Sequence, residues 1–258
     1  MKKIVILLFF LFPIYVSAQI AIIEIPFQQV KTDHLGNVYL LEKNKLSKYN
    51  KNGEFLYSYN NSNTGVISSF DVSDPFKILV FDKEYNQLFY LNAQLSLISD
   101  IIRLDDLGIS SSELACKSAK EGFWVFDSST LELKYFNQQN RLIYKSLNLD
   151  LIIEYTEAPN FLVERNNLLF LNFKSIGIIV FDSFGAFLKK IAIKDLENFQ
   201  VQRNEIIYFK TDSLVRYNYN LNTKNSTQFL SEKGVNNILV QNNLFYFIKN
   251  ESIEIVVK

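Results

Sequence analysis

Val38-Tyr39-Leu40-Leu41-Glu42 is a short apolar and aromatic run of the kind that forms a buried β-strand. Five later runs resemble it, at residues 78–82, 124–127, 168–172, 206–210 and 244–249. The last residues of successive runs lie 40, 45, 45, 38 and 39 positions apart. A repeat of about 40 residues with strand-like content is typical of the blades of a β-propeller. The series therefore predicts six blades in one ring.

Each run has strand-like neighbours on both sides. The segment after each of the first five runs ends in Asn or Asp, as in Leu46-Ser47-Lys48-Tyr49-Asn50. These short side chains hydrogen-bond to their own backbone and end a strand in a tight turn. Further strand candidates follow the turn at 55–59, 95–98, 141–144 and 187–193, and precede the run at 68–72, 114–117, 161–164, 199–202 and 237–240. We therefore expect an all-β fold with four antiparallel strands in each blade.

The two ends of the chain complete the predicted ring. After the sixth run only one strand candidate remains, 252–257, so the sixth blade has three strands. The apolar segment 20–25 precedes the first blade. A disordered N-terminus is the alternative for this segment, but its apolar side chains favour burial. Because a propeller leaves no open edge when an N-terminal strand completes its last blade, we expect 20–25 to close the ring.

Residues 1–18 have the pattern of an export signal. Lys2 and Lys3 supply the positive end, 4–16 the apolar stretch, and Val16-Ser17-Ala18 the cleavage site. A retained membrane anchor is the alternative, but the stretch is shorter than the roughly 20 residues of a spanning helix and contains Pro13. We expect residues 19–258 to form a single domain without a transmembrane segment. The expected location is the periplasm or cell surface of a Gram-negative bacterium.

The composition of the chain argues against several classes of partner and chemistry. The 27 basic and 27 acidic residues balance, and no basic stripe is present, so DNA and RNA are not expected partners. Cys116 is the only cysteine, which rules out an intrachain disulfide. It lies in an apolar segment, so we expect a buried, inert thiol rather than a reactive one. Trp124, inside the third run, is expected in the core rather than as a platform for a ligand.

Asp33-His34-Leu35-Gly36-Asn37-Val38-Tyr39, followed by 49–55, resembles the D-x-x-G-N-V-Y strand opening of six-bladed β-propellers of the NHL and TolB-like kind. The repeat period of these propellers is found throughout residues 19–258. Their sequence motif is matched well only in the first blade. The resemblance implies a second possible function, because related propeller hydrolases hold Ca²⁺ in the central channel. Acidic residues of a suitable type are Asp33, Asp71, Asp74, Glu121 and Glu164. They also fall where any propeller has polar turn residues.

Catalytic motifs are scarce in the sequence. His34 is the only histidine, and one imidazole in a turn forms neither a zinc site nor a triad without partners. No Cys cluster, phosphate-binding loop or Ca²⁺ loop is found. We therefore expect no catalytic residue, no metal and no cofactor.

Two connections are longer than the others, at 100–112 and 147–160, after the second and third blades. Additions on neighbouring repeats often build a binding face. The predicted apolar contacts are Ile101, Ile102, Leu104, Leu107, Ile152, Ile153 and Tyr155, and the predicted polar rim is Arg103, Asp105, Asp106, Glu154 and Glu157. The alternative is that the extra residues only form the outer strands of their blades.

These observations favour a non-enzymatic propeller that binds another protein. The expected partner is an outer-membrane barrel or secretion component, with the type 9 secretion system as the analogy. The alternative is a Ca²⁺-dependent hydrolase, or a binder of small ligands or carbohydrate, that uses the central channel. Acidic and amide side chains converging on the channel from three or more blades would favour that alternative.

Overall fold

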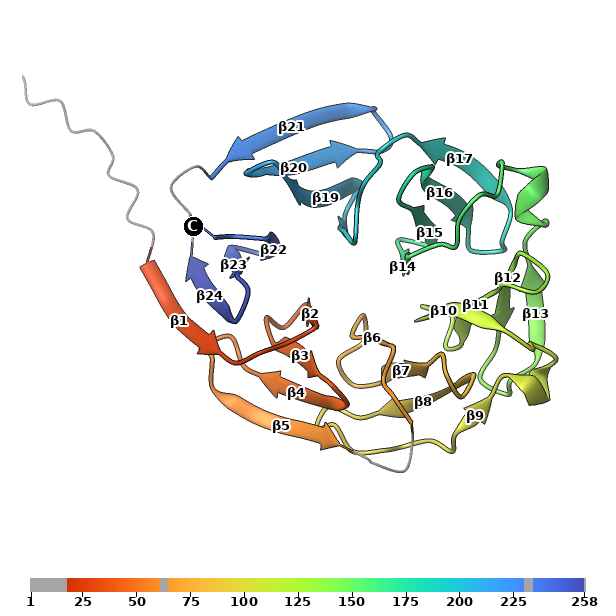
Figure 1. The fold of residues 1–258 in the computed structure, drawn as a ribbon, viewed down its shortest axis with the longest axis horizontal. Coiled ribbons are helices and arrows are strands. Elements are labelled where there is room, and N and C mark those ends of the chain that lie inside the picture. Colours follow the sequence, from red (N-terminus) through yellow and green to blue (C-terminus); the bar gives the residue numbers. More distant parts are fainter. Residues whose placement is uncertain (1–17, 61–64, 230–233, 258) are drawn as a thin grey trace, which may run out of the picture.

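A computed structural model describes residues 18–60, 65–229 and 234–257, and shows six four-stranded antiparallel sheets arranged as the blades of a ring (Figure 1). The prediction of a six-bladed all-β propeller is confirmed. The predicted export signal, 1–18, lies outside the described residues except for Ala18, the first residue of β1.

The strands follow the ring in chain order. The first blade contains β2 (Gln29–Thr32), β3 (Val38–Glu42), β4 (Lys45–Tyr49) and β5 (Phe55–Asn60). The second contains β6 (Ser69–Asp71), β7 (Ile78–Asp82), β8 (Gln87–Leu91) and β9 (Ile102–Arg103). The third contains β10 (Ser112–Lys117), β11 (Phe123–Asp127), β12 (Glu132–Phe136) and β13 (Leu142–Lys145).

The second half of the ring has the same plan. The fourth blade contains β14 (Phe161–Arg165), β15 (Leu168–Phe173), β16 (Gly177–Asp182) and β17 (Phe187–Ile191). The fifth contains β18 (Gln200–Gln202), β19 (Glu205–Lys210), β20 (Ser213–Asn218) and β21 (Thr223–Gln228). The sixth contains β22 (Asn237–Gln241), β23 (Leu244–Ile248), β24 (Ser252–Val257) and β1 (Ala18–Glu24). Two short 3₁₀ helices, η1 (Asp105–Leu107) and η2 (Leu149–Leu151), follow the second and third blades.

The six apolar runs form the second strand of each blade. In β7 and β11 every residue is buried, because both faces of the strand pack against neighbouring blades. This two-sided burial explains why the runs are continuously apolar rather than alternating. Trp124 in β11 is 1% exposed, so the prediction that it belongs to the core is confirmed.

Asn and Asp side chains hold the turns between the third and fourth strands. The Asn50 Oδ1 atom accepts hydrogen bonds from the backbone N–H groups of Asn52 (2.9 Å) and Glu54 (3.0 Å). Asn92, Asn137 and Asp182 accept the same two bonds in the next three blades. The predicted strand-ending role of these residues is confirmed.

β1 completes the sixth blade. It pairs antiparallel with β24, from Ala18 opposite Val257 to Glu24 opposite Ser252. Ile23 is 4% exposed and packs between the sixth and first blades. The strand lies at the outside of its blade (Figure 1), so the predicted ring closure by an N-terminal strand is confirmed.

Two outer strands differ from the sequence-based prediction. Residues 95–98 were expected to be a strand, but they contribute only an isolated bridge between Leu91 and Leu97, and β9 lies further on at Ile102–Arg103. β21 was not predicted, because all six of its side chains are polar and exposed. Outer strands need few buried side chains, so an apolar pattern does not mark them.

The outer edges of the described blades are irregular or polar. Register shifts interrupt the pairing of β1, β5, β13 and β17 with their neighbours, and β9 has only two residues. β21 is regular but polar, and it carries Lys224. Bulges, short edge strands and lysines all hinder pairing with another chain. The rim is therefore suited to contacts through side chains rather than to strand addition.

Asp127, at the end of β11, makes the stability of the fold dependent on pH. Its carboxylate is completely buried and accepts hydrogen bonds from Ser129 N–H (2.9 Å) and Lys134 Nζ (2.5 Å). Burial acts to raise the pKa of Asp127, but the bonds from Lys134 and Ser129 outweigh it and lower the pKa below the usual 3.8. A lowered folded-state pKa stabilises the protein above pH 3.8, and this stabilisation is lost as pH falls through the folded-state pKa.

We expect Asp127→Asn to remove part of the loss of stability on acidification. Urea unfolding at a series of pH values from about 7 down to about 3 measures this. Asp212→Asn, at an exposed turn residue, is the control and should keep the parent's pH dependence. An Asp127→Asn curve parallel to that of the parent would show that this carboxylate makes no contribution.

Candidate functional site

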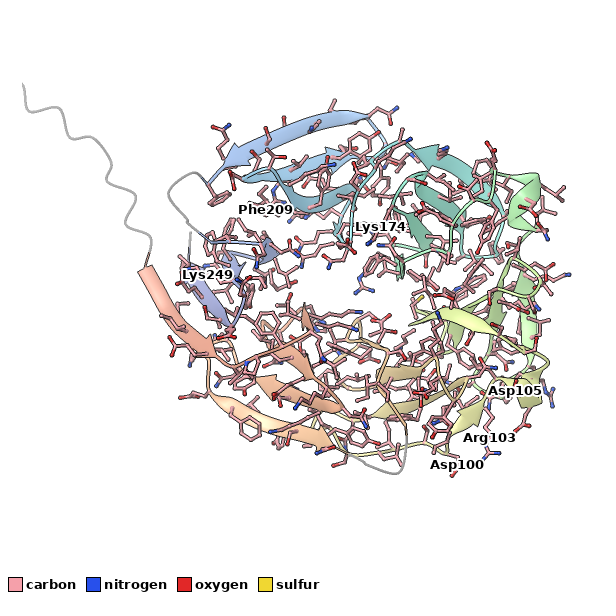
Figure 2. All side chains as sticks on the ribbon, in the orientation of Figure 1. Asp100, Arg103, Asp105, Lys174, Phe209 and Lys249 are labelled. Atoms are coloured by element: carbon pink, nitrogen blue, oxygen red, sulfur yellow. The ribbon has the colours of Figure 1, made fainter. Side chains whose placement is uncertain are left out.

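The two long connections lie on either side of the third blade, where η1 and η2 project at the rim (Figure 1). The first connection supplies the outer strand of the second blade, since Ile102 and Arg103 form β9. The alternative interpretation therefore holds for this part of it. Figure 2 shows Asp100, Arg103 and Asp105 at the outer edge of the ring.

Most apolar residues predicted to bind a partner turn inward instead. Leu104 is fully buried and Ile153 is 9% exposed, so neither presents a contact surface. Ile102, Leu107, Ile152 and Tyr155 are half-buried against the cores between blades. Of the seven apolar candidates, Ile101 alone is exposed, at 39%. The prediction of an apolar docking face made of these seven residues is thus wrong for Leu104 and Ile153.

Asn86 explains why the first connection turns inward. Its Nδ2 atom donates to Asp105 Oδ1 (3.0 Å) and to the Ile109 carbonyl (2.7 Å), and its Oδ1 atom accepts from Ser112 Oγ (2.5 Å). These bonds hold Leu104 and Ile109 in the gap between the second and third blades. Leu149 and Ile153 fill the next gap in the same way.

The predicted polar rim is largely at the surface. Arg103, Asp105, Asp106 and Glu154 are exposed. Glu157 is half-buried and accepts hydrogen bonds from the N–H (2.6 Å) and hydroxyl (2.8 Å) of Ser175. It therefore anchors its own connection to the fourth blade.

The sequence did not single out two leucines at the start and end of the η2 region, Leu147 just before η2 and Leu151 as its last residue. Leu147 is 63% exposed and Leu151 is 77% exposed, next to the exposed acidic residues Asp150 and Glu154. We call Leu147, Asp150, Leu151 and Glu154 the η2 surface. The sequence around these leucines shows neither the two-residue period of a strand nor the 3.6-residue period of an α-helix. No apolar pattern therefore indicates which leucine is exposed.

The acidic residues considered for Ca²⁺ have other roles. Asp33 accepts hydrogen bonds from the Leu35 and Asn37 N–H groups (both 2.9 Å) and from the Tyr39 hydroxyl (2.9 Å). Asp74 pairs with Lys117 (3.3 Å) and Glu121 with Lys77 (3.8 Å). Within 18–60, 65–229 and 234–257, no three His, Cys, Asp or Glu side chains meet as metal ligands.

Asp71 and Glu164 connect neighbouring blades. Asp71 Oδ2, in the second blade, accepts from the Lys117 N–H of the third blade (3.0 Å). Glu164, in the fourth blade, accepts from Trp124 Nε1 (2.8 Å) and from the Ala119 N–H (3.3 Å) of the third. These carboxylates supply the buried hydrogen-bond acceptors that donors on the next blade require.

His34 and Cys116 behave as the sequence predicts. His34 is exposed in its turn. Cys116 is 1% exposed, and burial raises the pKa of its thiol well above the usual value. A thiol that stays protonated is a poor nucleophile.

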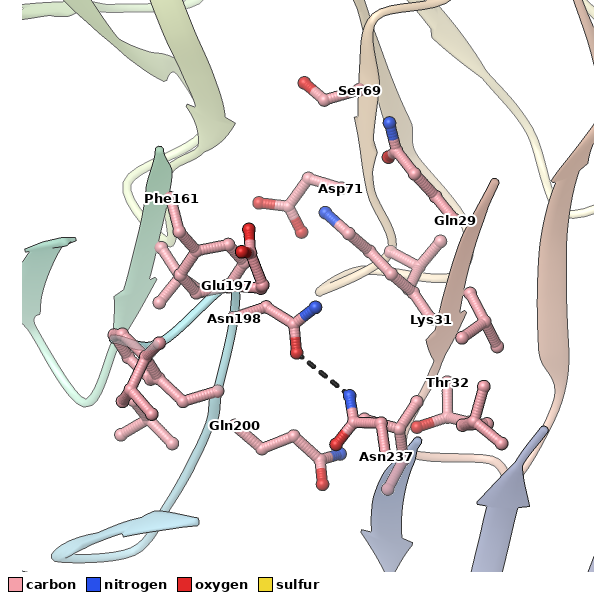
Figure 3. Close-up of a pocket in the computed structure, with 18 of the residues that line it drawn as sticks. Gln29, Lys31, Thr32, Ser69, Asp71, Phe161, Glu197, Asn198, Gln200 and Asn237 are labelled. Carbon is pink, nitrogen blue, oxygen red and sulfur yellow. Dashed lines mark hydrogen bonds between the residues drawn. The ribbon is translucent and has the colours of Figure 1, made fainter. Parts of the chain in front are cut away.

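The innermost strands of all six blades surround a channel with a cavity of about 850 Å³. Figure 3 shows Lys31 and Asp71 pointing toward one another, with Asn198, Gln200 and Asn237 grouped on another part of the wall. Asn237 Nδ2 donates to Asn198 Oδ1 (3.1 Å). Gln200 bonds to the Val240 carbonyl (3.1 Å) and N–H (2.8 Å), which joins the fifth blade to the sixth.

The cavity is lined by the cations Lys31, Arg165 and Lys249 and by the carboxylates of Asp33, Asp71, Asp195 and Glu197. Lys31, Arg165 and Asp71 form one group among them. Burial lowers the pKa of Lys31, the charge of Asp71 opposes this, and the charge of Arg165 lowers it further. Burial acts to raise the pKa of Asp71, but Arg165, Lys31 and the Ser73 amide outweigh it and lower the pKa. The three charges therefore lie close enough to influence one another.

The described residues contain no helix long and apolar enough to cross a membrane.

Comparisons with known proteins agree on the fold alone. No protein-family model matches the chain, and no curated protein sequence matches it. The crystal structure of BamB from Moraxella catarrhalis is similar at a TM-score of 0.57 and 12% identity, over 94% of this chain and all (100%) of that one.

Two further solved structures are similar in fold. A catalytically inactive histidine-to-alanine variant of virginiamycin B lyase from Staphylococcus aureus, with quinupristin, gives a TM-score of 0.60 at 10% identity over 92% of this chain and 99% of that one. A protein of unknown function from Bacteroides caccae gives a TM-score of 0.54 at 14% identity, over 79% of this chain and 78% of that one. Because identities this low carry only the architecture, the chain is identified as a six-bladed β-propeller.

Proposed function

We propose that the chain is an exported, non-enzymatic β-propeller that binds another protein. In this proposal it acts as an accessory or plug-like subunit on the periplasmic side of an outer-membrane translocon, with type 9 secretion as the analogy. The partner is an outer-membrane barrel or a secretion component. The export-signal pattern of residues 1–18 supports the location.

The η2 surface is the observation that carries this proposal. Leu151 has the highest exposure of the large apolar side chains in the described part of the chain, and Leu147 lies four residues before it. Exposed leucines within a charged rim are common at sites where proteins bind one another. The irregular outer edges favour contacts of this kind over strand addition.

The acidic residues of the chain support a non-enzymatic role. Asp33, Asp71 and Glu164 are each engaged by neighbouring donors. His34 is exposed, and among the described residues it belongs to no group of three His, Cys, Asp or Glu side chains that could hold a metal ion. Acid–base catalysis needs convergent titratable groups within hydrogen-bond reach, and this part of the chain offers none around His34.

Leu151→Glu is expected to reduce recovery of a membrane partner by about tenfold, because an apolar side chain at an interface centre often contributes more than 1 kcal/mol. Affinity purification from membranes of the host in mild detergent measures this. Leu221→Glu is the control, since Leu221 is 71% exposed on a turn of the fifth blade. Both variants should fold as the parent does.

Two results would contradict the proposal. One is recovery of the parent chain alone, at monomer mass. The other is equal recovery of the partner with Leu151→Glu and Leu221→Glu, which would exclude the η2 surface as the contact.

A further inference from the structure

Lys31 and Arg165 line the central channel near Asp71 but form no direct ion pair with any described residue. Both line the cavity, one on the innermost strand of the first blade and the other on that of the fourth. Neither takes part in an ion pair in the portions of the chain that the structure describes. A cation removed from bulk water without a paired charge is costly.

Most of the donors on these two groups have no hydrogen-bond partner among the described residues. Lys31 Nζ donates to the Phe70 carbonyl and lies over the rings of Phe70 (5.1 Å) and Phe161 (5.8 Å). Arg165 Nη1 donates to the Glu164 carbonyl (2.7 Å). An ammonium has three N–H donors and a guanidinium five, so several remain for a ligand.

Asp71 compensates part of their charge but forms no direct ion pair with either. Its Oδ1 atom accepts from the Ser73 N–H (2.8 Å) and its Oδ2 atom from the Lys117 N–H (3.0 Å). The carboxylate is thus directed toward backbone amides of its own turn and of the next blade. Of the other charged residues that line the cavity, Asp195, Glu197 and Lys249 form ion pairs with Lys210, Lys174 and Glu254, and Asp33 accepts hydrogen bonds within its own turn. Lys31 and Arg165 are the two cations of the lining for which no ion pair is found among the described residues.

The rest of the wall suits a ligand with hydroxyl groups. The Thr32 hydroxyl oxygen is buried and has no hydrogen-bond partner among the described residues. Gln241 and the Nδ2 group of Asn198 line the same cavity, and Phe161 contributes a half-buried ring. Amides and hydroxyls orient polar ligands in pockets of about 300–1,000 Å³, a range that includes this cavity.

We propose that the central channel binds a small anion that carries hydroxyl groups, such as a sugar acid, between Lys31 and Arg165. The anionic group accepts hydrogen bonds from the two cations, and the hydroxyl groups contact the amide side of the wall. Carboxylates and phosphates form strong charge-assisted bonds with such donors. The site is independent of the η2 surface, so the inference does not rest on the proposed function.

A purely structural role explains these two residues less well. Other lysines join neighbouring blades by donating to a carbonyl, as Lys48 does to Ala93 (2.9 Å) and Lys120 to Ser183 (2.8 Å), but unlike Lys31 these two do not line the channel cavity. Among the described residues, Lys31 donates to a carbonyl of the second blade and Arg165 to the carbonyl of its chain neighbour, and neither donates to a carboxylate. Their charges therefore remain available to a ligand.

Calorimetric titration of the purified protein tests the inference with three probes: D-galacturonate, its neutral match D-galactose, and inorganic phosphate. We expect galacturonate to bind at least about tenfold more tightly than galactose. Lys31→Met and Arg165→Gln should each weaken binding of galacturonate and phosphate by about tenfold or more. Lys224→Met, the same loss of charge on the exposed strand β21, should leave binding unchanged.

The titrations have distinct outcomes for a channel that binds the anion and for one that does not. Loss of binding in Lys31→Met and Arg165→Gln, with parent-like melting and retained binding in Lys224→Met, supports the site. The inference is overturned by failure of both anions to bind at concentrations up to about 20 mM. It is also overturned by galactose binding as tightly as galacturonate, or by affinities that the two channel variants leave unchanged.

Discussion

A chain that begins at Phe27, and so lacks β1, is expected to melt about 10–20 °C below the parent or to lose its cooperative transition. β1 pairs with β24 over six positions and buries Ile23 between the sixth and first blades. Several strand hydrogen bonds at about 1 kcal/mol each, with one buried isoleucine at about 2 kcal/mol, amount to roughly 5 kcal/mol. That is a large part of the total stability of a typical domain, about 5–15 kcal/mol. Thermal unfolding followed by circular dichroism measures the effect.

Two adjacent isoleucines provide a matched control for this effect. Ile23 is 4% exposed and Ile22 is 44% exposed, because successive side chains of a strand point to opposite faces. Ile23→Asp should therefore destabilise the protein by several kcal/mol, and Ile22→Asp by less than about 1 kcal/mol. Equal melting temperatures for the two variants would show that β1 does not close the ring through its buried face.

Much of the ring could be predicted from the sequence because its signals are local or periodic. The middle of the second strand of each blade is buried on both faces and is therefore apolar, as are the four residues that precede Asp82 in β7. The turns depend on single side chains such as Asn50, whose bonds reach only four residues along the chain. The closing strand was predictable because the sixth blade lacked a partner and 20–25 is apolar.

The outer strands and the surface were less predictable. β9 and β21 make few buried contacts, so no apolar pattern marks them. The burial of Leu104 depends on distant parts of the chain, such as the bonds of Asn86 that hold the first connection in place. No local pattern contains that information.

The channel site is formed by residues that only the ring brings together. Lys31 and Arg165 belong to the first and fourth blades. A signal was nevertheless present in the sequence, because polar residues recur at every second position of some innermost strands. Gln29 and Lys31 are one such pair, and Gln200 and Gln202 are another. Their alternation marks the side of the strand that faces the channel.

Trp124→Ala is expected to be the most destabilising single substitution in the third blade. Trp124 is 1% exposed, packs against Tyr135 with ring centroids 5.4 Å apart, and donates to Glu164 (2.8 Å). Loss of the indole leaves a cavity, which costs about 3–5 kcal/mol. It also leaves the buried Glu164 carboxylate without its strongest donor, at a further cost of about 1–3 kcal/mol. Urea unfolding measures the sum.

A double-mutant cycle separates these two contributions and tests whether this hydrogen bond joins the third blade to the fourth. Trp124→Phe keeps most of the ring volume but removes the N–H donor, so most of its cost should come from the unpaired carboxylate. Glu164→Leu should then cost at least about 1 kcal/mol less in the Trp124→Phe protein than in the parent. Additive costs would mean that Glu164 acts mainly through the Ala119 amide (3.3 Å). Coupling would instead show that a tryptophan in one repeat and a carboxylate in the next stabilise the ring together, as buried polar pairs do when each satisfies the other.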